Sequence, residues 1–66
     1  MSVLKVVELM ASSKKSWEDA TAKAVKKASK SLKGIKSAYV KDQSVVVNNG
    51  EVAEYRVNLK VTFEVK

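Results

Sequence analysis

The strongest constraint on this chain is a strict two-residue alternation near its end. From Tyr55 to Val65, apolar side chains occupy every second position, and polar or charged side chains stand between them. Because successive side chains of a β-strand point to opposite faces, the segment is predicted to be a strand with one apolar and one polar face. The run is longer than the usual strand of about 5–6 residues, so it should dominate its sheet. The apolar set is Tyr55, Val57, Leu59, Val61, Phe63 and Val65, and the polar set is Arg56, Asn58, Lys60, Thr62 and Glu64.

A helix is predicted upstream of this strand, over Ser13–Lys33. Its apolar residues recur three or four positions apart, which places them on one stripe of a helix. Ser13 or Ser16 is expected to cap the start, and Ser16 with Asp19 resembles a capping box. Gly34 is expected to end the helix, because glycine adopts the left-handed conformation at little steric cost. The stripe consists of Trp17, Ala20, Ala24, Val25, Ala28 and Leu32.

Two more β-prone segments complete the pattern. Ser2–Met10 carries Val and Leu on both of its faces, which predicts a strand that is buried on more than one side. Ile35–Val47 and Val52–Val65 flank an Asn-Gly pair, the strongest short signal for a hairpin turn. The sequence therefore predicts a single α+β domain over residues 1–66, with the order β-α-β-β and a sheet of three strands, two of them an antiparallel hairpin.

The size of the chain favours assembly. A domain of 66 residues buries only about 60% of the surface of its unfolded chain and is usually marginal alone. The sequence contains no Cys and no His, so disulfides, thiolate zinc sites and histidine metal ligands are all excluded. One helix can hardly cover a sheet with such long strands. We therefore expect a homo-oligomer in which a second sheet face lines a cavity or a subunit interface.

Composition argues against several classes of function. The net charge is +6, but the basic residues are almost all Lys, with Arg56 as the single arginine, so a solvated basic surface is favoured over a nucleic-acid interface. No segment is apolar enough for a membrane span or a signal peptide, which predicts a cytoplasmic protein. Without His, Cys or a Gly-rich phosphate loop, no catalytic arrangement is recognisable, and we expect a protein that is not an enzyme.

Several single residues leave alternatives open. Trp17 is expected in the core or an interface rather than stacked on a ligand, because it heads the helical stripe. The carboxylates of Glu18 and Asp19 suit the helix dipole at the helix start. Together with Asp42 they also suit calcium, if a site is assembled across subunits. Arg56 is suited to anchoring a phosphate or carboxylate, or to an ion pair between subunits. The candidate partners of that pair are Glu8, Asp42 and Glu54.

Taken together, the segments resemble the dodecin family over nearly the whole chain. The resemblance implies a three-stranded antiparallel sheet that wraps around one helix, assembled into a hollow homododecamer that binds and stores flavins between subunits. It is carried by residues 4–9 (LKVVEL), 16–20 (SWEDA), 34–35 (GI), 42–43 (DQ) and 55–63 (YRVNLKVTF).

The same resemblance indicates where a ligand would be bound. In the family, a Trp at the start of the second strand stacks on the flavin ring, and a Gln in the third strand hydrogen-bonds its polar edge. Here Ser37 and Arg56 occupy those positions, and Gln43 is the third candidate contact. Flavin binding is therefore expected to be weak or absent, as in the members without this Trp, one of which is a calcium-binding dodecin. The alternatives are an ion-holding or purely structural shell and, more remotely, a small basic nucleic-acid-associated protein.

Overall fold

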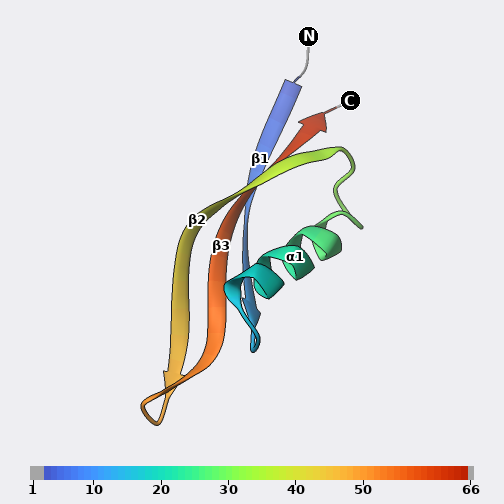
Figure 1. Cartoon of the computed structure of the whole chain (residues 1–66). Coiled ribbons are helices and arrows are strands. Elements are labelled where there is room, and N and C mark those ends of the chain that lie inside the picture. The colour runs from blue at the N-terminus through green and yellow to red at the C-terminus, as the bar shows by residue number, and fades with distance from the viewer. Residues whose placement is uncertain (1–2, 66) are drawn as a thin grey trace.

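The chain forms a three-stranded antiparallel sheet with one helix lying across one of its faces (Figure 1). The computed structural model describes residues 3–65. The elements are β1 (Val3–Ser13), α1 (Trp17–Ala28), β2 (Ile35–Asn48) and β3 (Glu51–Val65). The strand order is β1-β3-β2, so the last strand is central and pairs antiparallel with both neighbours. The predicted α+β class and β-α-β-β order are confirmed.

The alternation along β3 creates the core. Val57, Leu59 and Val61 are buried and pack against Ala20 on the inner side of α1. The small Ala20 side chain lets the helix approach the sheet closely. Removing most of a buried side chain such as Leu59 should cost about 2–5 kcal/mol of stability. The partly buried apolar residues packed against this core are Val7, Leu9, Ala11, Trp17, Ala24, Ile35 and Val40.

The hairpin between β2 and β3 forms as the sequence predicts. Asn49 and Gly50 form the two-residue turn with φ angles of 53° and 77°, the left-handed values that a type I′ turn needs at both positions. β2 and β3 each extend one residue further towards the turn than predicted. β1 continues to Ser13, three residues beyond the predicted end, whereas its predicted first residue, Ser2, lies outside the described residues.

The helix is shorter at both ends than predicted. It starts at Trp17, where the Ser16 Oγ accepts a hydrogen bond from the Asp19 N–H at 2.9 Å, so Ser16 is the N-cap. It ends at Ala28, and the Ser29 hydroxyl donates to the Lys26 carbonyl. Serine side chains compete for backbone groups in this way, which weakens helix continuation.

Gly34 does not end the helix, contrary to the prediction. It has the expected positive φ of 75°, but it lies where the chain rejoins the sheet. Its carbonyl accepts a hydrogen bond from the Glu64 N–H at 3.0 Å. The left-handed residue thus sets the entry into β2 rather than the end of α1.

The β2–β3 hairpin extends past the helix as a long arm (Figure 1). The Cα extents of the described chain are 51 × 19 × 14 Å, which reflects this elongation. Register shifts in the β2–β3 pairing fall after Ile35, Val40 and Val46, and such bulges increase local bend and twist. We call residues 44–55 the hairpin arm.

Candidate functional site

The sheet has one face that no element of the described chain covers, and we call it the bare face. Residues paired across neighbouring strands share a face, so the pairings of Arg56 with Ser12 and Ser44 place all three there. Along β3, the buried helix-side residues Val57 and Leu59 alternate with residues whose side chains lie on the bare face. The bare face consists of Leu4, Val6, Glu8, Met10 and Ser12 from β1, Arg56, Asn58, Lys60, Thr62 and Glu64 from β3, and Ser37, Tyr39, Asp42 and Ser44 from β2.

The bare face carries large exposed apolar side chains. Leu4 and Val6 are more than half exposed, Met10 is 69% exposed and Tyr39 is 68% exposed. The prediction that β1 is buried on both sides is therefore wrong for the single chain. Apolar side chains gathered on one face indicate a surface that another molecule covers.

A depression lined by both polar and apolar groups lies at the centre of the bare face. Its volume is about 290 Å³, and its lining includes Glu8, Met10, Lys41 and Asn58. Lys41 is the unpaired residue of a bulge, and its Nζ reaches across the sheet to Glu8 Oε1 at 3.3 Å. The ion pair joins the two edge strands over β3. Both side chains are well exposed, so it contributes at most about 1 kcal/mol.

The candidate ligand contacts predicted from the sequence fall on different parts of the sheet. Ser37 lies opposite Thr62, six positions along β3 from Arg56. At the usual rise this is about 20 Å, which is longer than a flavin ring system. The two residues can thus touch one planar ligand only if they come from different subunits. Gln43 pairs with Val57 on the helix side of the sheet, away from both of them.

Arg56 is exposed and has hydroxyl groups on both sides. Ser12 and Ser44 are its cross-strand neighbours, and within residues 3–65 it joins no salt bridge. Of its predicted partners, Glu8 is engaged by Lys41. A free guanidinium beside two hydroxyls is a set of hydrogen-bond donors suited to a carboxylate or phosphate oxygen.

Trp17 lies on the opposite side of the sheet from this surface. Its indole N–H donates to the Ser44 carbonyl at 3.0 Å, and its ring meets the Tyr55 ring edge-on at a centroid distance of 5.2 Å. The residue is half-buried and packs on the core, as predicted. It fastens the start of α1 to the base of the hairpin arm.

Asp19 is already engaged within the chain. Its Oδ2 accepts a hydrogen bond from the Ser13 hydroxyl at 2.5 Å and lies 3.1 Å from Lys23 Nζ. These two partners, the hydroxyl first, hold the pKa of Asp19 below its usual value. Its carboxylate thus bonds Ser13, so the predicted capping box is only half formed. Among residues 3–65, no three acidic side chains gather into a group that could hold a metal.

Comparison with known proteins agrees with this architecture. The family model for Dodecin matches residues 3–66. The chain belongs to the dodecin family. Dodecins are small-ligand-binding proteins, and the family includes flavin binders.

The chain is similar in sequence and structure to two known dodecins from different organisms. The calcium dodecin of Mycobacterium tuberculosis is 38% identical over 66 residues, spanning 100% of this chain and 93% of the relative. Its crystal structure, described as having a novel calcium-binding site, superposes with a TM-score of 0.85 and covers 98% of this chain and 93% of that one. A point mutant of the Thermus thermophilus dodecin is 32% identical, covers 100% of this chain and 98% of that one, and has a TM-score of 0.93.

Tyr39 is a candidate site residue that the sequence analysis did not single out. It stands two positions after Ser37 on the bare face and presents an exposed aromatic ring. The face on which the Tyr39 side chain lies could not be predicted from the sequence, because each extra residue in a bulge of β2 reverses the alternation of faces.

Within residues 3–65, no helix is sufficiently long and apolar to span a membrane.

Proposed function

We propose that this dodecin forms a hollow homododecamer that binds and stores a small ligand between its subunits. The observation that carries the proposal is the bare face, where exposed Met10 and Tyr39 lie beside a row of polar residues on β3. A single chain leaves this face to solvent. In the assembly, facing sheets would enclose it and create a site with both apolar and hydrogen-bonding walls.

We further propose that flavin binds weakly. Ser37 offers no ring for stacking, and Arg56 offers only donors and a positive charge where the family has an amide. Tyr39 supplies an aromatic surface near Ser37, which favours a residual affinity for planar ligands. Arg56 and Ser37 remain the predicted contacts on the bare face, and Gln43, on the helix side of the sheet, would have to come from a different subunit. Arg56 is equally suited to an ion pair with a carboxylate of a neighbouring subunit.

Calcium is the second candidate ligand, and the 38% identity with a calcium dodecin favours it. Calcium takes six to eight oxygen ligands, and the described residues of one chain do not gather them. A site would therefore draw carboxylates from several subunits. Glu18 and Asp42 are the candidates of the earlier set that form no salt bridge within residues 3–65, whereas Asp19 is held by Lys23.

The remaining proposals concern what the protein does not do. We propose a cytoplasmic binding protein that neither catalyses a reaction nor binds nucleic acid or membranes. The sequence has no His or Cys to act as a general base or nucleophile, and its positive charge rests on scattered lysines. Salt-dependent retention on nucleic acid would contradict this view.

Native mass spectrometry of the untagged protein as purified tests the main proposal. A mass of twelve protomers is expected, and any excess mass identifies flavin or calcium directly. A twelve-protomer mass without an adduct would favour a purely structural shell. A mass near one 7.2 kDa chain would refute the assembly.

A further inference from the structure

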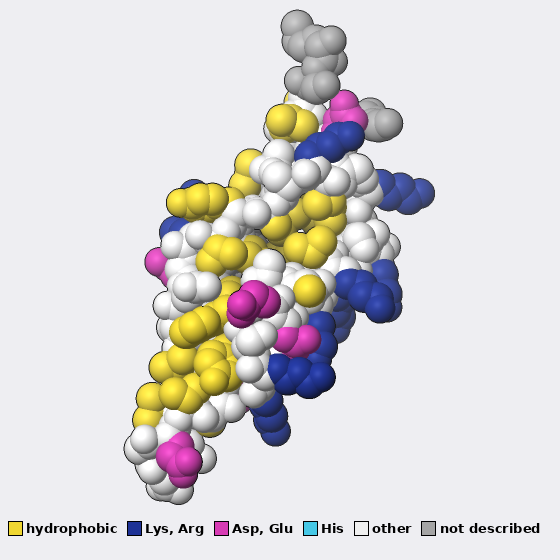
Figure 2. Space-filling model, in the orientation of Figure 1, with side chains coloured by type: hydrophobic (Ala, Val, Ile, Leu, Met, Phe, Trp, Pro, Cys, Tyr) yellow, Lys and Arg dark blue, Asp and Glu magenta, His cyan; other side chains and the backbone are white. Residues whose placement is uncertain are grey.

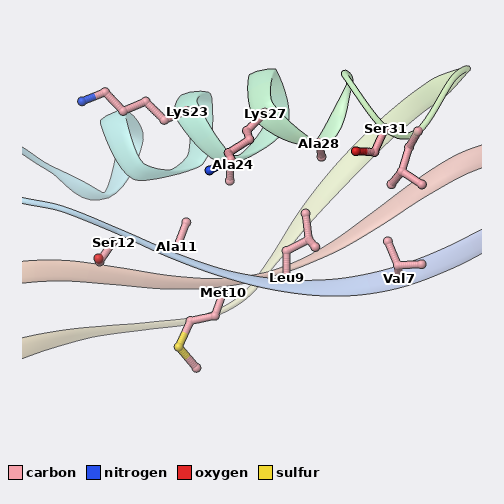
Figure 3. A pocket seen from close by; sticks show the side chains of 11 residues that line it. Val7, Leu9, Met10, Ala11, Ser12, Lys23, Ala24, Lys27, Ala28 and Ser31 are labelled. Carbon is pink, nitrogen blue, oxygen red and sulfur yellow. The ribbon is translucent and has the colours of Figure 1, made fainter.

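An apolar groove runs between α1 and β1 on the helix side of the sheet (Figure 3). Its volume is about 610 Å³. Leu9 and Ala11 point into it from the strand, and Ala24 and Ala28 point into it from the helix (Figure 3). We call it the helix–strand groove. Its apolar lining also includes Val7 and Leu32.

The groove opens at an unpaired edge of the sheet. β1 is the outermost strand, and Met10 and Ser12, whose side chains belong to the bare face, also line the groove at that edge. Within residues 3–65, no strand pairs with the outer side of β1. An open strand edge beside an apolar channel favours association with another chain.

The rim of the groove is basic. Lys23 and Lys27 of α1 line it, and α1 has no acidic residue after Asp19. The salt bridge of Lys23 with Asp19 leaves Lys27 as a cation that no described carboxylate contacts. An occupant that combines apolar and acidic side chains would match this groove.

The hairpin arm has that combination. Val47 and Val52 are paired across its tip and are 62% and 50% exposed, and Val45 is also exposed. Figure 2 shows hydrophobic side chains along the arm, with acidic atoms at its tip. The hairpin arm, residues 44–55, contains two acidic residues, Glu51 and Glu54, and no basic residue.

We propose that the hairpin arm of one copy docks in the helix–strand groove of a neighbouring copy. Val47 and Val52 would enter the apolar channel, and the acidic end of the arm would approach Lys27. Arm and groove are different surfaces of the same chain, so the contact is head-to-tail and must close into a ring within a finite assembly. The inference rests on the proposed homo-oligomer and names one of its contacts.

Engineered cysteines provide the test, because the chain has none of its own. Val47→Cys on the arm and Ala28→Cys in the groove should form a disulfide only between chains. Trp17 holds the base of the arm at Ser44, and Ala28 lies eleven residues along the helix, a rise of about 16 Å. The arm extends from Ser44 away from α1 (Figure 1). A disulfide requires Cα atoms closer than about 7 Å.

After mild oxidation of the assembled protein, the double variant should run as a ladder of covalent multimers on a non-reducing gel. The largest multimer then gives the number of chains in the ring. Each single variant should run as a single chain on the same gel. The matched control combines Val47→Cys with Lys26→Cys on the outer side of α1. This control should also run as a single chain on the gel. Reductant should collapse the ladder.

Two results would overturn the contact while leaving the assembly intact. One is a twelve-protomer native mass with no ladder, and the other is dimer formation by Val47→Cys alone, which would show that two arms meet each other. A monomeric wild-type mass would refute the proposed assembly together with the contact. Val47→Glu gives an independent readout: it should shift the native mass to smaller species, whereas Lys26→Glu should not. An unchanged assembly in Val47→Glu would refute the inference.

Discussion

Trp17 fastens the hairpin arm to the helix, and replacing it should measure how much that attachment stabilises the fold. Trp17→Phe keeps a ring but removes the hydrogen bond to the Ser44 carbonyl, 3.0 Å long. Because water can reach that exposed carbonyl, the loss should be about 0.5–1 kcal/mol. Trp17→Leu also removes the edge-on contact with Tyr55 at 5.2 Å, which adds about 0.5–1.5 kcal/mol.

Urea unfolding followed by far-UV circular dichroism is the suitable assay, because Trp17 is the only tryptophan and fluorescence would be lost. All variants must be compared at one protomer concentration, since oligomer stability depends on it. A double-mutant cycle with Tyr55→Leu should give a coupling of about 1 kcal/mol. Tyr39→Leu, on the bare face, is the matched control and should not couple. A Tyr55 coupling of zero would refute the assigned contact.

Three further predictions concern the ligand, the helix start and the chain reversal. Combining Ser37→Trp with Arg56→Gln should tighten riboflavin binding by about fivefold, since one aromatic contact contributes about 1 kcal/mol. Quenching of riboflavin fluorescence measures the affinity, with Lys33→Trp as the control, and no gain would contradict the assigned positions. Because the pKa of Asp19 is lowered in the folded state, its carboxylate stabilises the fold above the normal pKa of 3.8, and this contribution is lost as the pH falls through the folded-state value. Asp19→Asn should therefore flatten that part of the acid-unfolding profile. Gly34→Ala should destabilise by about 1 kcal/mol, because φ is 75°, whereas the added Cβ would meet only ordinary contacts near 3.5 Å from Glu64; an unchanged urea midpoint would contradict this.

The elements set by local pattern were predictable. The alternation from Tyr55 to Val65 defines β3 and its two faces, because each side chain's direction follows from its neighbours alone. Asn49 and Gly50 define the hairpin turn for a similarly local reason, the positive φ that both positions adopt. The position of Trp17 in the helical stripe also predicted its packing against the core.

The helix ends were predicted less well. Lysine-rich sequence that favours helix continues to Lys33, but α1 ends at Ala28. The chain must turn back in time for Ile35 to pair with Phe63 at the far end of the sheet. That requirement comes from the position of the sheet in space, and local helix propensity does not depend on it.

The candidate site shows the same division. The sequence by itself determined that β3 has an apolar and a polar face, that the chain has no thiol or imidazole chemistry, and that one helix leaves part of the sheet uncovered. Only the tertiary structure decided that Gln43 faces the helix side, that Tyr39 joins Ser37 on the bare face, and that Lys41 reaches Glu8 across the sheet. The physical reason is that these directions depend on bulges and on pairing between distant strands, and each bulge reverses which face the following residues occupy.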